Sequence, residues 1–335
     1  MATLIKQWPT GAGNLSVTYE GSGDGTAVFT SDANEGIDRV MDVAFKAGDV
    51  VEQRIVTQEG LRQPFGLSGG GVFRIANGGR FGVLKKAIDN SINIEDYLTI
   101  EALADGLTVT LANYPVDYCI DGSGQWKTLD AGVASEAINT GQTISFKAEY
   151  TSSDNSRRFS ISKSCNVIGD PMSLYYGDNA KDYNTVPYTY SFSYLFYNCT
   201  TIVDATRLVL DRKLKSYAYS YMFYGCSNLL YPPELPATTL STGCYRYMFR
   251  NCSNMLKAPV LPALTLTSYC YEYMFTGCSD LAEITMLATN KSASNCMLGW
   301  VSKVKSKGTF YKNKDATWTT TGVSGVPGGW TVILI

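Results

Sequence analysis

The chain of 335 residues carries 28 Lys and Arg against 30 Asp and Glu, and it contains no histidine. The lack of histidine excludes Ser-His-Asp and Cys-His catalysis, imidazole metal ligands and imidazole pH switches. A net charge of −2 with only 17% charged residues gives no sign of the clustered Lys and Arg that nucleic acids or anionic membranes require. We therefore expect no catalytic residue, no metal, no cofactor and no nucleic-acid partner, whereas the 23 tyrosines suit neutral, hydroxyl-rich partners or an oligomer that buries much of its surface.

Residues 1–65 have the pattern of a small β-sandwich. Apolar and polar positions alternate between Gly, Asn and Asp turns, which predicts short strands at 15–19, 27–29, 40–46 and 50–56. The first 14 residues contain no apolar stretch, and no run in the chain reaches the roughly 18 apolar residues of a membrane span. We expect neither a secretory leader nor a transmembrane segment.

Residues 66–86 are rich in glycine, with Gly69–Gly71 in a row and Gly78 next to Gly79. A phosphate-binding loop would place such glycines between a strand and a helix, with a Lys followed by Ser or Thr, and this order is missing. The composition therefore predicts a flexible or closely packed linker.

Residues 87–170 show alternation again, separated by D-G, D-G-S-G and N-T-G turns. Strands are predicted at 97–102, 107–111, 117–121, 142–148 and 159–163, which fits a second sandwich. Trp126 suits either a binding groove or a half-buried structural position, and the structural position is favoured.

The region 171–300 repeats itself. It reads Y-A-Y-S-Y-M-F-Y-G-C-S-N-L from Tyr217, G-C-Y-R-Y-M-F-R-N-C-S-N-M from Gly243 and Y-C-Y-E-Y-M-F-T-G-C-S-D-L from Tyr269, with a degenerate copy from Tyr190. The cysteines that close the copies are 27, 26 and 26 residues apart: Cys199, Cys226, Cys252 and Cys278. A fixed period of this length predicts a solenoid of stacked units.

One short helix and one short strand are predicted for each unit of about 26 residues. Cys244, Tyr247, Met248 and Cys252 fall at i, i+3, i+4 and i+8, which is the apolar stripe of a short helix. The apolar runs at 229–236 and 255–262 end in proline and indicate one strand per unit, stacked about 4.8 Å apart in a narrow parallel sheet.

The cysteines form two columns at the repeat spacing, one at 199, 226, 252 and 278 and the other at 244, 270 and 296. Identical positions on parallel rungs present unsuitable Cβ vectors for a disulfide, and no C-x-x-C pair indicates zinc. Buried free thiols are therefore favoured. Residues 301–335 are predicted to cap the array, with strands at 309–312 and 330–335.

Two parts of the chain resemble known families. S-V-T-Y from Ser16, S-D-A-N-E-G from Ser31 and R-I-V-T-Q-E-G from Arg54 resemble the BACON family (Bacteroidetes-associated carbohydrate-binding, often N-terminal) of immunoglobulin-like modules. The stretches Y-M-F-Y-G-C-S-N-L, L-P-A-T-T-L-S-T-G-C-Y and A-P-V-L-P-A-L-T-L resemble the BspA-type leucine-rich repeat over about 190–300. Such arrays occur in adhesion and surface-recognition proteins of gut bacteria and in virion proteins of the phages that infect them.

These observations predict a mainly β, multidomain protein with two immunoglobulin-like sandwiches, a leucine-rich-repeat solenoid and a β cap. The function that we expect is a non-enzymatic phage virion protein for attachment (a fibre, decoration or tail-associated component), with other virion proteins bound by the N-terminal region and a host glycan or protein by the solenoid. By analogy with phage fibres, we expect a homotrimer. A secreted or cell-surface adhesin is the alternative; a glycan-active enzyme is the weakest reading, because carboxylates such as Asp178 and Asp182 are spaced like turn and capping residues.

A carbohydrate-binding strip is the predicted site. It consists of Tyr219, Tyr245 and Tyr271, each seven residues before a closing cysteine, and of Tyr231. A flat ladder of tyrosines would stack on sugar rings and offer a polar tip as well. The competing interpretation, which the sequence favours, is that these rings pack between successive rungs.

Overall fold

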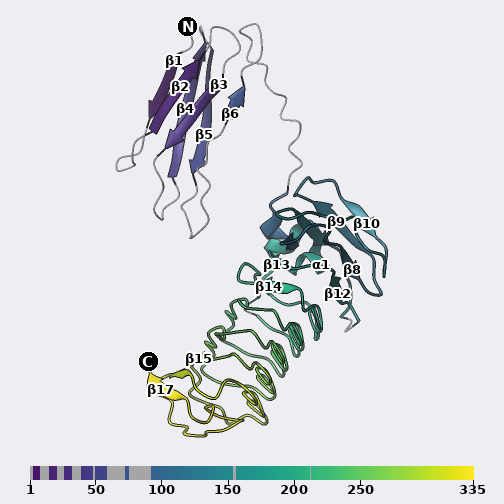
Figure 1. Cartoon of the computed structure of the whole chain (residues 1–335), viewed down its shortest axis with the longest axis vertical. Helices are drawn as coiled ribbons and strands as arrows, with labels where there is room; N and C mark the ends of the chain where they lie inside the picture. Colours follow the sequence, from purple (N-terminus) through teal and green to yellow (C-terminus); the bar gives the residue numbers. More distant parts are fainter. Residues whose placement is uncertain are drawn as a thin grey trace. The chain divides into compact units, whose positions relative to one another are not determined.

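The computed structural model describes residues 92–153, 156–211 and 213–335 in full, together with the backbone of six strands within residues 1–91 (Figure 1). The chain divides into two compact units, Met1–Asp89 and Asn90–Ile335. Strands predominate and helix is scarce, so the predicted mainly β class is confirmed.

The first unit contains two antiparallel sheets of three strands each, in the orders β1-β4-β5 and β2-β3-β6. The strands are β1 (Thr3–Gln7), β2 (Leu15–Glu20), β3 (Thr26–Ser31), β4 (Arg39–Ala47), β5 (Val50–Gln58) and β6 (Val72–Arg74). The four predicted strands are therefore present as β2 to β5. β6 falls within the predicted glycine-rich linker and pairs with β3, while the rest of 66–86 lies outside the described residues.

The second unit begins with a sheet of six strands in the order β10-β9-β11-β7-β13-β14 and a pair, β12-β8. Its strands are β7 (Leu98–Ala102), β8 (Val109–Leu111), β9 (Val116–Ile120), β10 (Lys127–Leu129), β11 (Thr143–Lys147), β12 (Phe159–Ile161), β13 (Cys165–Ile168) and β14 (Ile202–Asp204). Neighbouring strands run antiparallel except β13 and β14, and β14 comes from the first repeat copy. The sheet and the repeats therefore share one hydrophobic core, which extends from Leu98 to Trp330.

Three short helical segments occur in the described part of the chain: the 3₁₀ turns η1 (Ile94–Asp96) and η2 (Gly177–Asp182) and the single-turn helix α1 (Ser173–Tyr176). Ser173 attaches α1 to the six-stranded sheet, because its hydroxyl accepts from the Leu98 amide at 2.9 Å and donates to the Phe146 carbonyl at 2.9 Å. These bonds fix the position of α1, which contains Tyr175 and Tyr176.

The repeat copies form stacked coils, one per copy (Figure 1). Backbone amides of one coil donate to carbonyls of the next, as from Tyr221 to Arg246 and from Tyr247 to Glu272, both at 2.9 Å. Alternate amides instead close tight turns within the coil, as from Tyr224 to Tyr221 at 3.1 Å. Each backbone amide of residues 217–226 therefore donates a hydrogen bond either to the next coil or within its own coil.

The predicted helix of each unit is wrong. A helix requires amides bonded to the carbonyl four residues earlier and negative φ throughout. Here every fourth residue has a positive φ, for example Tyr217 (56°), Tyr221 (59°) and Gly225 (76°). Burial therefore follows a period of four residues. Over only nine positions this period differs little from the 3.6 residues of a helical turn, so the apolar stripe in the sequence could not distinguish a helix from a series of turns.

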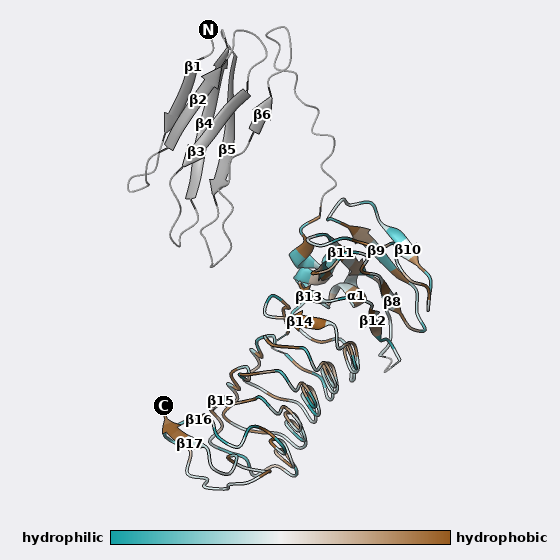
Figure 2. Ribbon diagram, in the orientation of Figure 1, coloured by the Kyte–Doolittle hydropathy of each residue, from teal (hydrophilic) through white to brown (hydrophobic). Residues whose placement is uncertain are grey.

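The predicted strand per unit is present only in part. The first copy contains β14 and the fourth contains β15 (Glu283–Met286), whereas the second and third copies contribute isolated bridges such as Asp204 with Tyr231 and Leu261 with Met286. β15, β16 (Thr309–Lys312) and β17 (Thr331–Leu334) form a parallel sheet at the end of the stack. The strands predicted at 309–312 and 330–335 are confirmed as β16 and β17, and Figure 2 shows the hydrophobic character of β17.

All nine cysteines are free and buried. The thiols of the closing column donate across the stack, from Cys226 to the Phe196 carbonyl at 3.1 Å and from Cys252 to the Phe223 carbonyl at 3.1 Å. Burial raises the pKa of these thiols well above its usual range, so they remain protonated donors. The cysteines of the closing column therefore connect successive coils through hydrogen bonds, without disulfides.

Candidate functional site

The predicted carbohydrate strip does not exist as a surface. Tyr219, Tyr245 and Tyr271 are at most 1% exposed, and their rings stack inside the coils with centroids 6.0 and 6.2 Å apart. The reason is the four-residue period of the turns, which directs this column into the core. Packing between rungs, the competing interpretation, is what the structure contains.

Tyr231, the fourth predicted residue, is 53% exposed but stands apart from the buried column. The column one residue further along in each copy varies in sequence and is mostly buried as well. Ser193, Ser220 and Glu272 are buried, and Glu272 pairs with the partly exposed Arg246. Variation along this column therefore reflects polar packing within the stack.

A second column of tyrosines reaches the surface of the coils, and we call it the tyrosine ladder. Its rings stack almost in parallel, with centroids 4.5, 4.5 and 4.9 Å apart: Tyr194, Tyr221, Tyr247 and Tyr273. All four residues have a positive φ, which costs an L-residue roughly 1–2 kcal/mol. Because the ring faces between successive tyrosines cover one another, the interior of the ladder has no free face for a sugar and acts as part of the fold.

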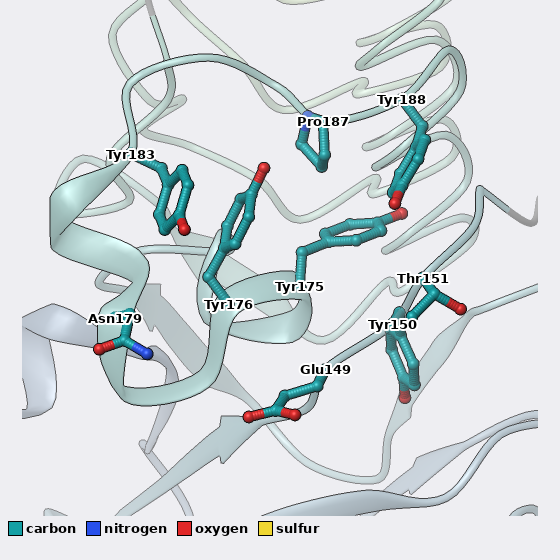
Figure 3. A pocket seen from close by; sticks show the side chains of 9 residues that line it. All are labelled: Glu149, Tyr150, Thr151, Tyr175, Tyr176, Asn179, Tyr183, Pro187 and Tyr188. Atoms are coloured by element: carbon teal, nitrogen blue, oxygen red, sulfur yellow. The ribbon is translucent and has the colours of Figure 1, made fainter.

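An open hollow of about 290 Å³ lies next to α1 and η2, and tyrosines dominate its wall (Figure 3). We call it the tyrosine hollow. Its lining residues are Glu149, Tyr150, Thr151, Tyr175, Tyr176, Asn179, Tyr183, Pro187 and Tyr188. Figure 3 shows Tyr176 and Tyr183 on one side and Tyr188 on the other, with Tyr175 between them.

The inner wall of the hollow is rigid because Arg157 holds it. This buried guanidinium lies 4.1 Å from the ring centroid of Tyr150 and donates to the Tyr175 hydroxyl at 3.1 Å. The Tyr175 hydroxyl in turn donates to the Ser191 carbonyl at 2.7 Å. Stacking and hydrogen bonds therefore fix the Tyr175 ring before any ligand arrives.

The outer wall offers exposed aromatic surface. Tyr176 and Tyr183 stack with centroids 3.6 Å apart and an interplanar angle of 7°. Tyr183 is 46% exposed and Tyr188 is 38% exposed, so both rings can be reached from solvent. A tyrosine hydroxyl is protonated at neutral pH, and burial raises the pKa of Tyr176 further, so this group can donate a hydrogen bond to a ligand.

Polar groups complete the hollow. Glu149 and Asn179 are exposed and lie below the rings of Tyr176 and Tyr183 in Figure 3, and Thr151 adds a hydroxyl. Aromatic faces with a few acceptors and donors suit a neutral, hydroxyl-rich ligand, because one face of a sugar ring is apolar and its edge is polar. Glu149 is the one carboxyl group among the lining residues.

Other polar residues singled out in the sequence serve the fold. Asp178 accepts from the Tyr97 hydroxyl at 2.7 Å and from Lys147 at 2.8 Å. Trp126 is half-buried, 5.1 Å from the Tyr97 ring and beneath the Lys147 ammonium. Within the described residues no cluster of His, Cys, Asp or Glu could hold a metal ion.

The sequence reasoning missed the tyrosine hollow. Its signal was the density of tyrosine just before the first clear repeat, at positions 175, 176, 183 and 188. These tyrosines belong to no repeat column, so the repeat period does not indicate them.

Comparisons with family models, with curated proteins and with solved structures gave no match for this chain. In the part of the chain that the structure describes, no helix is long and apolar enough to cross a membrane.

Proposed function

We propose that this chain is a non-enzymatic attachment protein that recognises saccharides through the tyrosine hollow. The observation that carries the proposal is the pair of exposed aromatic side chains, Tyr183 and Tyr188, on opposite sides of a hollow whose inner wall is already fixed. Preorganised rings lose little conformational entropy on binding, and they offer apolar area with a polar tip.

The repeat region is the second part of the proposal. We infer that the stacked coils are a leucine-rich-repeat-like solenoid and that the strands before them, in both units, form immunoglobulin-like sandwiches. Amides bonded from coil to coil and ring columns that continue through four coils support the first inference. A rigid stack of this kind would hold the hollow at a fixed distance from the end of the array.

The setting that we propose is the virion of a phage, as a fibre, decoration or tail-associated component docked through residues 1–65. The resemblance of the repeats to those of virion and adhesion proteins supports it. A cell-surface adhesin of a bacterium remains the alternative, and mass spectrometry of purified virions and of the secreted fraction distinguishes the two. The expected homotrimer is checked by the mass of the protein in solution.

A glycan array probed with the full chain tests the function. We expect binding to a restricted set of neutral oligosaccharides, with retention that falls when the free sugar is added. Binding to no glycan on the array, by protein that is folded by circular dichroism, would contradict the proposal.

A further inference from the structure

A second hollow, of about 460 Å³, lies where strands β8 and β12 meet the first coil. We call it the arginine hollow. Hydroxyl, amide and guanidinium groups line much of it: Thr110, Arg158, Ser160, Asn198, Thr200 and Thr201. The described residues of its wall include no Asp or Glu, in contrast to the tyrosine hollow with Glu149.

Arg158 is the one charged residue among those lining residues, and it is exposed. Its guanidinium lies 4.9 Å from the ring centroid of Tyr194 and 5.0 Å from that of Tyr197. Tyr194 is the first ring of the tyrosine ladder, so the arginine sits at the end of that stack. Stacking on two rings restricts the planar side chain while leaving its N–H donors free for a ligand.

Arg158 forms no ion pair with any carboxylate in the described ranges, unlike Arg207 with Glu95 or Arg246 with Glu272. The Arg158 guanidinium, held by two rings and lying beside the hydroxyls of Ser160 and Thr200, is suited to an anionic group. Ser160 and Thr200 are both exposed on the wall and can donate to the same anion or to neighbouring hydroxyls.

We infer that the arginine hollow binds an acidic saccharide, with its carboxylate or sulfate on Arg158 and its ring hydroxyls on Ser160, Asn198 and Thr200. A nucleic acid is disfavoured, because it would require several clustered cations and this wall has one. The site rests on the proposed saccharide recognition but uses different residues from the tyrosine hollow, so either can fail without the other.

The test compares three polymers that share one backbone: dextran, carboxymethyl-dextran and dextran sulfate, each immobilised and titrated with the full chain at 150 mM salt. We expect the wild type to bind at least one anionic form about tenfold more tightly than dextran, which is the size of effect that one charge-assisted contact gives. Arg158→Gln should abolish this preference. Lys163→Gln, which removes an exposed cation three residues beyond Ser160, should keep it.

A second variant adds a charge without touching the arginine. Ser160 is exposed on β12, and Ser160→Asp places a carboxylate on the wall, which should abolish the preference as well. Equal binding of all three polymers by the wild type would overturn the inference, as would an anionic preference that survives Arg158→Gln. Binding of single-stranded DNA at least as tight as that of either anionic dextran, and equally dependent on Arg158, would overturn the saccharide assignment. Loss of sugar binding in Tyr183 and Tyr188 variants with the anionic preference intact would support two separate sites.

Discussion

Replacing Tyr245 by phenylalanine removes a hydroxyl that is fully buried and has no hydrogen-bond partner in the described part of the chain. Its neighbour in the same column, Tyr219, differs in one respect. The Tyr219 hydroxyl accepts from the Asp211 amide at 3.0 Å and donates to the Asp211 carboxylate at 3.4 Å. The two rings are equally buried and stack on each other, so the pair isolates the effect of the hydroxyl.

The two substitutions should change stability in opposite directions. An unsatisfied buried polar group costs about 1–3 kcal/mol, so Tyr245→Phe should raise the free energy of unfolding by about 1 kcal/mol or more. Tyr219→Phe leaves the Asp211 amide without its acceptor and should lower the free energy of unfolding by a similar amount. In a unit of this size, 1 kcal/mol corresponds to about 2–4 °C in melting temperature.

Urea unfolding of the full chain, followed by tyrosine and tryptophan fluorescence, measures both changes. Equal m-values in the three proteins would show that stability, rather than the unfolded ensemble, has changed. If both variants unfold like the wild type and instead lose sugar binding, the column faces solvent and the packing described above is wrong.

Two further predictions concern the same unit. Burial raises the pKa of Asp211 to about 7 from its usual 3.8, so between these values the folded state keeps a proton that the unfolded state has released, and stability falls as pH rises through this window. Asp211→Asn should therefore become more stable relative to the wild type between pH 5 and pH 7.5 in urea titrations, and parallel pH profiles would refute this. Gly243→Ala should cost more than about 2 kcal/mol, because φ is +59° and the new Cβ would lie 2.3 Å from Tyr217 Cε1. Gly132→Ala, at φ +75° with no atom within 4 Å, should cost only about 1 kcal/mol, and equal melting temperatures for the two variants would contradict the steric argument.

Much of the strand structure was predictable because alternation records one buried and one exposed face. β16 buries alternate residues in this way, and β7 and β11 begin and end within one residue of their predicted ranges although nearly all of their side chains are buried. The repeat period and the burial of its cysteines could also be read from the sequence, since stacked units reuse the same core positions.

The structure within each coil could not be read in this way. A stripe at i, i+3, i+4 and i+8 fits both a helix and a succession of turns with a period of four, and the sequence does not show that Tyr221 or Tyr247 has a positive φ. Tyrosine is a poor choice for that conformation on intrinsic grounds. Stacking along the ladder, a tertiary effect, compensates for the local cost.

The candidate site could not be predicted from the sequence, for a related reason. An aromatic residue recurs seven residues before each closing cysteine, and such a regular column resembles a binding surface. In stacked coils, however, the positions that recur most regularly are those of the core, and this column is buried. The hollow is built from Tyr183 and Tyr188 on the irregular segment before the repeats and from Glu149 after β11, and only the fold brings these parts together.

The most direct test of saccharide recognition is the affinity of the full chain for the sugar that binds best on the glycan array, measured by isothermal titration calorimetry. The double variant Tyr183→Ser, Tyr188→Ser removes both exposed rings of the tyrosine hollow, and Tyr231→Ser removes an equally exposed tyrosine elsewhere. We predict that the double variant binds at least about tenfold more weakly, consistent with the loss of roughly 1 kcal/mol or more per aromatic contact, and that Tyr231→Ser binds like the wild type. Equal affinity of the wild type and the folded double variant would contradict the assignment of the hollow as the site of recognition.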